Sequence, residues 1–280
     1  MVKYNIRKPT DKEILKCINV LYSAFDRPLP TKIKVEEKIW KALIESEIGT
    51  FLISEENGKL FGVGGVFFFG KVSSFGYMAV LPEYRCKGIG TEIFKSLLEI
   101  ANQMKCETNF LYASKLGKPI YQKFGFQESF YATMYQLSKQ KPEFQIHNYR
   151  VKELKKIPKW ILSLDKQAIG YDRERYLTFR VEFGAKILAV ENVGFGLLAN
   201  SRLGPLIATN QIVAQQIVKK SVNLGADHMI VTNHNYIPKP LFKSINLVEE
   251  EKNANVKMVR GKKLSEKLSL LYAIATYAKG

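Results

Sequence analysis

The chain has 280 residues, 46% of them hydrophobic, and a formal net charge of +17 at pH 7. This length is typical of two domains, and the hydrophobic content is sufficient for two cores. No apolar run reaches the roughly 18 residues of a transmembrane helix, and the first residues lack the apolar segment of a signal peptide, so we expect a cytoplasmic protein without a membrane partner.

The positive charge is spread along the whole chain, which favours attraction of polyanions in general, a polyanionic cofactor as well as nucleic acid. No compact basic tail or RNA-binding aromatic pattern accompanies it, so we do not expect nucleic acid as a partner. The cysteines and histidines lack the spacing of metal ligands, and we predict no metal site. These residues are Cys17, Cys86, Cys106, His147, His228 and His234.

Apolar periodicity and turn residues predict a regular series of elements in the first half of the chain. A strand is followed by two helices, a hairpin whose turn is residues 55–58, and a third strand of the same sheet. A helix, a strand, a short helix and a closing strand come next. The predicted ranges are 3–8, 11–25, 35–45, 50–54, 60–69, 73–80, 91–105, 110–114, 118–124 and 131–137.

A basic turn with two glycines joins the strand at 73–80 to the helix that follows. The first N–H groups of a helix have no partner within the helix, and together with the helix dipole they bind phosphate. Gly88 and Gly90 allow a ligand to approach the backbone closely, and Arg85 and Lys87 add positive charge. The sequence therefore predicts a pyrophosphate site, but with neither the P-loop nor the dinucleotide order of glycines.

The pattern Arg85-x-x-Gly88-x-Gly90 resembles the acetyl-CoA loop of the GNAT superfamily of N-acyltransferases. A second stretch, Tyr121-x-x-Phe124-Gly125-Phe126, resembles the GNAT segment that follows the strand after the CoA-binding helix. Both occur in the order of the family, and the resemblance covers residues 3–138. It implies an α/β (α+β) fold, with a mixed, mostly antiparallel sheet flanked by helices, and acetyl-CoA as co-substrate.

The resemblance also implies roles for particular residues. The backbone N–H of Val80 is expected to bind the thioester oxygen through a bulge in its strand, and the phenol of Tyr121 is expected to protonate the leaving thiolate. The alternative for Tyr121 is a packed aromatic ring, and Cys86 is expected to contribute mainly its backbone N–H. The residues expected to contact the cofactor are Met78, Val80, Arg85, Cys86, Lys87, Gly88, Ile89, Gly90, Thr91 and Tyr121.

The general base is not evident, because the strand at 73–78 carries no carboxylate, whereas some family members have a glutamate there. Asp26, between the first two helices, is a candidate, and we expect Glu83 to face solvent. Asp165 or Asp172 of the second half are alternatives, although Asp172 is better explained as a helix cap. Arg173 binds either an acidic substrate group or a helix carboxylate. The aromatic run at 67–69 is expected in the core, with an acceptor pocket as the alternative.

The second half, residues 144–280, follows a polar linker at 138–143 and repeats the predicted order of the first half, residues 1–140. Its elements are expected at 144–151, 157–169, 172–179, 186–190, 194–199, 206–208, 212–224, 229–231 and 240–247. Residues 208–211 lead straight into a helix without the glycine pattern. This half resembles the degenerate second GNAT unit of tandem acetyltransferases, and we expect it not to bind acetyl-CoA in the usual way.

Taken together, the sequence predicts an N-acetyltransferase in which a primary amine attacks acetyl-CoA directly in a ternary complex. The acceptor is a small metabolite, an antibiotic-like molecule, or a protein N-terminus or lysine. The alternative is a CoA-binding regulatory module without turnover. A homodimer is possible through sheet edges or through the apolar segment at 268–277.

Overall fold

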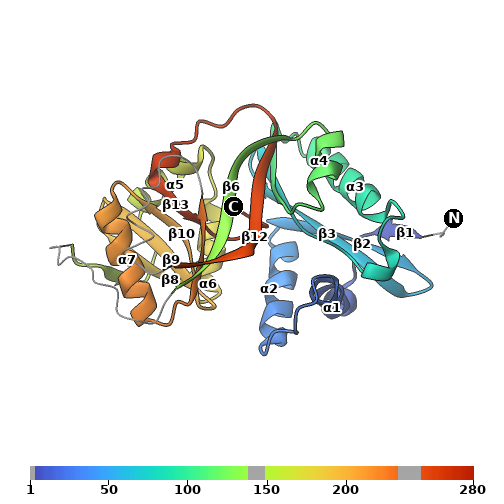
Figure 1. Ribbon diagram of the computed structural model, residues 1–280, viewed down its shortest axis with the longest axis horizontal. Coiled ribbons are helices and arrows are strands. Elements are labelled where there is room, and N and C mark those ends of the chain that lie inside the picture. Colours follow the sequence, from blue (N-terminus) through green and yellow to red (C-terminus); the bar gives the residue numbers. More distant parts are fainter. Residues whose placement is uncertain (1–3, 138–148, 233–246) are drawn as a thin grey trace. The chain divides into compact units, whose positions relative to one another are not determined.

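The computed structural model describes residues 4–137, 149–232 and 247–280, and it divides into two compact units (Figure 1). The first unit comprises residues 1–111 and Lys279, and the second comprises residues 112–278 and Gly280. The predicted linker at 138–143 lies outside the described residues. Residues 112–137 group with the second unit. The domain boundary predicted between 140 and 144 stays a prediction.

The first unit contains a sheet with the strand order β1-β2-β3-β4-β5. Neighbouring strands are antiparallel up to β4, whereas β4 and β5 are parallel. The strands are β1 (Asn5–Arg7), β2 (Gly49–Glu56), β3 (Lys59–Phe69), β4 (Val72–Val80) and β5 (Thr108–Ala113). The helices are α1 (Ile14–Ala24), α2 (Ile33–Glu45) and α3 (Ile89–Gln103).

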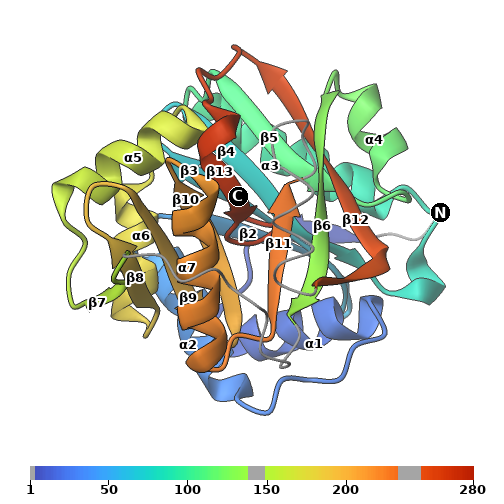
Figure 2. The ribbon, with the colours of Figure 1, turned by 60° about the vertical axis from the view of Figure 1, so that its left-hand side comes forward.

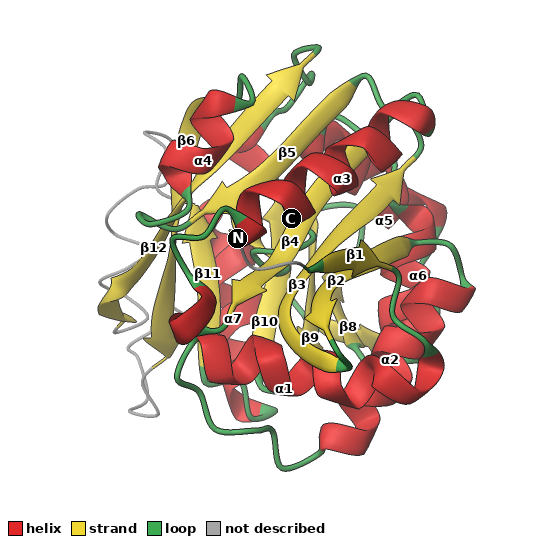
Figure 3. Ribbon diagram, turned by 90° about the vertical axis from the view of Figure 1, so that its right-hand side faces the viewer, coloured by secondary structure: helices red, strands yellow, loops and turns green. Residues whose placement is uncertain are grey.

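Two adjacent glycines of β3 show that α3 and α2 cover opposite faces of this sheet. A Cβ atom at Gly64 would lie 2.8 Å from Ile93 of α3, and one at Gly65 would lie 3.0 Å from Phe51. The Phe51 ring stacks on Trp40 of α2, with 4.2 Å between ring centroids. Successive strand residues face opposite sides. The absence of side chains at Gly64 therefore lets α3 pack closely against β3, as Figure 3 shows.

The predicted elements of the first half are confirmed, with ends that shift by a few residues. The largest shift is at the last strand, which begins at Gln127 instead of the predicted Tyr131, and α3 begins at Ile89 instead of the predicted Thr91. Gly88 has a left-handed conformation with φ = 82° and serves as the N-cap. The glycine pair therefore lies at the start of the helix itself, and Gly90 belongs to its first turn.

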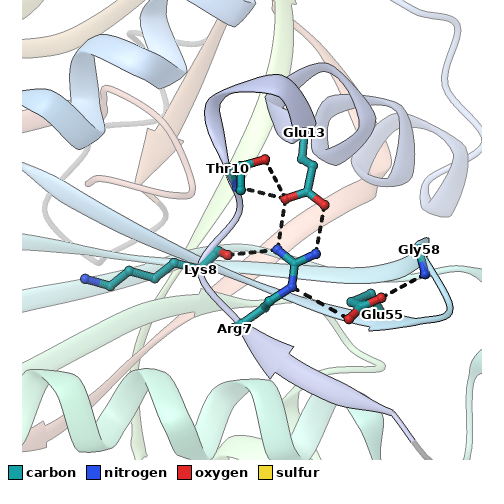
Figure 4. Close-up of polar contacts among 6 residues, drawn as sticks. All are labelled: Arg7, Lys8, Thr10, Glu13, Glu55 and Gly58. Atoms are coloured by element: carbon teal, nitrogen blue, oxygen red, sulfur yellow. Dashed lines mark hydrogen bonds and ion pairs between the residues drawn. The ribbon is translucent and has the colours of Figure 1, made fainter.

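A group of charged residues fixes β1 to the start of the first helical segment (Figure 4). The Arg7 guanidinium donates to both carboxylate oxygens of Glu13, at 2.9 and 2.8 Å, and its Nε lies 3.6 Å from Glu55. Glu13 also accepts from the backbone N–H and hydroxyl of Thr10, at 2.8 and 2.9 Å, which completes a capping box. These donors, Arg7 first, lower the pKa of Glu13 to about 2.

We expect Glu13→Gln to destabilise the first unit at neutral pH by about 1 kcal/mol, a value reduced by solvent screening. Because the pKa of Glu13 is lowered to about 2 on folding, its ionised form stabilises the fold above the unfolded-state pKa of about 4.3. The difference between wild type and variant should shrink as the pH falls from there towards 2. Urea unfolding at pH 7, 4 and 2.5 measures this. Glu99→Gln, at an exposed site on α3, should show no such convergence.

The second unit also contains a sheet with helices. The order of its strands is β12-β6-β11-β13-β10-β9-β8-β7. Its strands are β6 (Gln127–Leu137), β7 (Lys152–Leu154), β8 (Lys186–Val190), β9 (Gly194–Ala199), β10 (Arg202–Ala208), β11 (His228–Thr232), β12 (Leu247–Gly261) and β13 (Leu271–Ile274). Its helices are α4 (Lys118–Lys123), α5 (Lys159–Ile169), α6 (Glu174–Glu182) and α7 (Gln211–Asn223). Helix α7 packs on the sheet through Val213, Ile217 and Val218 (Figure 2).

The apolar segment at 268–277, a possible subunit contact, contains a strand of the second unit. Its strand β13 pairs with β10 on one side and with β11 on the other, inside the sheet of the second unit. Leu271 and Ile274 are 3% and 2% exposed. The hydrogen-bonding edges and apolar side chains of β13 are thus used within the chain, and a homodimer stays a prediction. The predicted strand at 144–151 and the segment at 240–246 lie largely outside the described residues.

None of the described helices combines the length and the apolar character needed to cross a membrane. Within the same described ranges, no group of three or more His, Cys, Asp or Glu side chains is arranged to hold a metal ion.

Candidate active site

Strand β4 carries a bulge near its end. Ala79 pairs with Val63 and Gly76 pairs with Gly65, so that Tyr77 and Met78 together lie opposite Gly64. Tyr77 has φ = 57°, a conformation that non-glycine residues rarely adopt within a strand. Bulges re-aim the backbone and side chains of the strand that carries them. The expected bulge in the strand before the loop is thus present, three residues before the strand ends.

The backbone of Val80 points away from β3. The N–H of Leu81 donates to the carbonyl oxygen of Phe61 at 2.9 Å, and Val80 is paired with Gly62. In an antiparallel ladder, hydrogen-bonded and non-bonded pairs alternate, so both backbone groups of Val80 face the opposite side of the strand. On that side the parallel ladder with β5 ends at the pair Phe75 and Leu111. The N–H of Val80 therefore lies beyond the ladder.

The N-terminus of α3 presents a row of backbone donors. The first bond within the helix runs from the N–H of Glu92 to the carbonyl oxygen of Gly88, at 3.1 Å. The N–H groups of the three residues before Glu92 have no acceptor within the helix, and the helix dipole adds partial positive charge there. The N-cap, Gly88, has no side chain that accepts from them. This geometry fits an anion.

The space around Gly90 indicates whether the loop can hold a pyrophosphate. A Cβ atom at this position would meet Val80 Cγ2 at 3.6 Å, which is ordinary van der Waals contact. Alanine would therefore fit within the protein and would favour the helix by about 1 kcal/mol. Packing within the described chain does not explain the glycine, whereas close approach of a ligand to the backbone does. The loop therefore fits a pyrophosphate group held by the first turn of α3.

The two cations of the loop bind backbone oxygens. Arg85 Nε donates to the Val80 carbonyl at 3.0 Å, and its Nη2 donates to the carbonyl of Ala24 at the end of α1. Lys87 Nζ donates to the carbonyl of Glu83 at 3.0 Å and lies 5.2 Å from the Tyr84 ring centroid. Arg85 thus fixes the end of β4 to α1 and holds the loop in shape. Direct contact of either side chain with phosphate stays a prediction.

Cys86 is exposed and has φ = 61°. Its side chain therefore contributes little packing to the loop. This agrees with the expectation that the residue contributes mainly through its backbone, but the contact with a cofactor is still a prediction.

Tyr121 lies on α4 in the second unit and is 9% exposed. A Cβ atom at Gly117 would lie 3.1 Å from its ring, and the ring meets Phe126 edge-on at 6.4 Å between centroids. Burial raises the pKa of the phenol, which is therefore protonated at neutral pH. The side chain is a packed aromatic whose phenol keeps its proton at neutral pH, and its role in catalysis stays a prediction.

The candidate bases have different surroundings. Asp26 is exposed at the end of α1 with φ = 49°, and Glu83 is exposed as expected. Asp165 is buried and accepts from Arg173 at 2.8 and 2.9 Å, so it is not available as a base. Asp172 accepts from the N–H of Glu174 at 2.9 Å, which confirms a capping role at α6. Arg173 therefore binds a helix carboxylate, the second of its two alternatives.

In the described part of the second unit, the helix and the strand pair that correspond to the candidate site are arranged differently. Helix α7 is capped by Asn210, whose side chain accepts from the N–H of Val213 at 3.0 Å. The parallel pairing of β10 with β11 covers only Arg202–His228 and Leu203–Met229, after which β13 lies between them. The expectation that the second half does not bind acetyl-CoA in the usual way stays a prediction.

Sequence reasoning missed one feature of the first unit. The ammonium of Lys279 lies beside Phe67 and Tyr77 and donates to the Tyr77 hydroxyl at 2.6 Å. The run at 67–69 was expected in the core, and Phe67 is indeed buried. The contact of Phe67 with Lys279 depends on the conformation of Tyr77, and no pattern in the sequence predicts that conformation.

A bulged strand, a glycine turn and a helix N-terminus without a side-chain cap together form a site in an α/β protein that fits a pyrophosphate-bearing ligand. Family models of acetyltransferase (GNAT) domains match residues 47–128 and residues 161–273. A solved structure of a "putative acetyltransferase" from Pyrococcus horikoshii is 33% identical and covers 100% of this chain and 97% of its own, with a TM-score of 0.91. The chain therefore belongs to the GNAT acetyltransferase family, with two such domains in tandem.

A more distant structure shares the fold, and a second relative matches part of the chain. A GCN5-related N-acetyltransferase from Sphaerobacter thermophilus, 12% identical, shares the fold over 95% of this chain and 99% of its own, with a TM-score of 0.66. The "uncharacterized N-acetyltransferase YitH" of Bacillus subtilis is 25% identical over 178 residues, or 59% of this chain. That match spans 61% of the relative's length.

Proposed function

We propose that this protein transfers the acetyl group of acetyl-CoA to a primary amine by direct attack in a ternary complex, with acetyl-CoA held by the first half of the chain. One observation carries the proposal. Val80, whose N–H faces away from β3, lies next to the first turn of α3, since a Cβ atom at Gly90 would lie 3.6 Å from Val80 Cγ2. A donor for a thioester oxygen thus adjoins a site for a pyrophosphate.

The residues have distinct parts in the proposed reaction. The N–H groups of Ile89, Gly90 and Thr91 hold the pyrophosphate, and the N–H of Val80 stabilises the negative charge that develops on the carbonyl oxygen. As the new C–N bond forms and the C–S bond breaks, the phenol of Tyr121 supplies a proton to the departing sulfur. The amine loses one proton, for which Asp26 stays the candidate acceptor.

Calorimetric titration of acetyl-CoA into the protein, followed by measurement of thiol release with a panel of primary amines, tests the proposal. We expect micromolar binding and amine-dependent release of free CoA. Absence of binding would overturn the proposal. Binding without release for any amine would instead support a CoA-binding regulatory module, which the absence of a carboxylate on the strand at 73–78 favours.

We expect Tyr121→Phe to lower kcat by about 100-fold, the lower end of what a general acid contributes. The affinity for acetyl-CoA should stay the same, because the ring still fills its place between Gly117 and Phe126. Steady-state kinetics and calorimetry measure the two effects separately. Tyr131→Phe removes a hydroxyl from a tyrosine that is 47% exposed and serves as the matched control. Unchanged turnover of Tyr121→Phe, where chemistry limits the rate, would leave only the packing role.

A further inference from the structure

The side chain of Lys279, which groups with the first unit, ends among aromatic rings. Its ammonium nitrogen lies 4.7 Å from the ring centroid of Tyr77 and 4.9 Å from that of Phe67. It also donates a hydrogen bond to the Tyr77 hydroxyl at 2.6 Å. Lys279 is only 5% exposed. A primary ammonium on a four-carbon chain is therefore held at a defined, buried position in the acetyl-CoA-binding half of the protein.

Further rings support the two that contact the ammonium. The Tyr77 ring meets Trp40 at 4.9 Å and Phe51 at 5.7 Å between centroids. Trp40, Phe51 and Phe67 are at most 1% exposed, so their rings are fixed by packing. Aromatic faces attract cations, and more strongly when water is excluded. We name these four residues, Trp40, Phe51, Phe67 and Tyr77, the aromatic cage.

The cage belongs to the same strand as the proposed thioester site. Tyr77 is a bulge residue of β4, and Val80 follows it by three residues. Tyr77 is held at φ = 57°, a conformation that costs about 1–3 kcal/mol in a non-glycine residue. A lysine also loses side-chain entropy and hydration when it is buried. The contacts of the ammonium with Tyr77 and Phe67 offset the cost of burying the lysine, a cost that an apolar side chain in its place would avoid.

We propose that the aromatic cage is the recognition site for the cationic head of the acceptor, an aliphatic primary amine similar to a lysine side chain, and that Lys279 fills it until the acceptor displaces it. This inference rests on the proposed function, and it names the substrate class of that site. Because Lys279 is part of the chain, it competes with the acceptor at every concentration of protein. The apparent affinity for the acceptor is then reduced by the fraction of molecules in which the cage is filled.

The first test uses n-butylamine, which carries the ammonium and four-carbon chain of lysine, with n-butanol as the uncharged control. We expect n-butylamine at millimolar concentration to raise the melting temperature of Lys279→Ala, and n-butanol not to do so. The shift should be smaller in wild type, and smaller in Lys279→Ala combined with Tyr77→Phe, which lacks the hydroxyl. Equal shifts in Lys279→Ala and wild type would overturn the proposal. This readout requires no acetyl-CoA, so it is independent of the proposed function.

The second test is kinetic. We expect Lys279→Ala to lower the KM for n-butylamine about 10-fold and to keep kcat and the affinity for acetyl-CoA. Lys279→Gln, which keeps the chain length and loses the charge, should lower KM by a smaller factor, and it replaces the alanine variant if that variant does not fold. A KM that is unchanged or raised in the folded variant would assign Lys279 to packing alone. If wild type did not bind acetyl-CoA, the proposed function would be refuted, whereas the thermal test of the aromatic cage would still be valid.

Discussion

Gly90→Glu is expected to remove acetyl-CoA binding, with a loss of at least about 100-fold in affinity, while the protein stays folded. The glutamate would stand in the first turn of α3, beside the N–H groups proposed to hold the pyrophosphate. Its carboxylate would repel that group and occupy its place. The fold should tolerate it, since a Cβ atom has room at this position and an acidic side chain near a helix N-terminus is favourable. Calorimetry measures the binding and circular dichroism the fold.

Two control variants separate charge from shape. Gly90→Ala adds only a Cβ atom and should retain part of the binding while stabilising α3 by about 1 kcal/mol. Gln211→Glu places the same charge in the first turn of α7, where Asn210 already caps the helix, and should leave binding unchanged. Wild-type affinity in a folded Gly90→Glu variant would show that the pyrophosphate binds elsewhere.

Asp165→Ala is expected to destabilise the second unit by about 3–5 kcal/mol, because it leaves a buried guanidinium without its counter-charge. The side chains of Arg173 and Asp165 are 1% and 2% exposed, and two hydrogen bonds join them. Arg173 also donates to the backbone oxygen of Gly280 at 2.7 Å. The pair therefore links α5, the start of α6 and residue 280. Urea unfolding, monitored by fluorescence and circular dichroism, measures the loss.

The double variant Asp165→Leu with Arg173→Met distinguishes a charge effect from a packing effect. It removes both charges and fills the space with apolar side chains, so we expect it to recover much of the lost stability, as replacements of buried ion pairs often do. Lys186→Ala breaks an exposed pair with Glu153, whose atoms lie 3.9 Å apart, and should change stability by less than about 0.5 kcal/mol. If the double variant were less stable than Asp165→Ala, the role of the pair would lie in geometry that apolar packing cannot replace.

The sequence was most informative where one physical signal determines one element. Alternating and helical apolar patterns predicted β8 and β9 to the residue, and the glycine turn predicted the start of α3 within two residues. It was less informative for β12, whose first residues are strongly charged, and for β13, where an apolar run has no signal for its partners.

The parts of the candidate site also differ in how well the sequence predicts them. The pyrophosphate loop is continuous in sequence and was visible in residues 85–91. The aromatic cage brings residues of α2, β2, β3 and β4 together with Lys279. These residues are far apart in the sequence, so no local pattern predicts the cage. The conformation of Tyr77 follows from the mismatch of β3 and β4 in number of residues, which depends on strand register and therefore on the folded sheet.

Strand β13 fills the space between two strands of the second unit, because it pairs with both β10 and β11. In the second unit, the two parallel strands after Leu203 and Met229 are held apart by one extended peptide chain. The corresponding strands of the first unit end their pairing at Phe75 and Leu111. The pantetheine arm of CoA is itself an extended chain with two amide groups, so it can substitute for a missing strand. Under the proposed function, acetyl-CoA would take the place in the first unit that β13 takes in the second, and an acetyl-CoA titration should then saturate at one equivalent per chain.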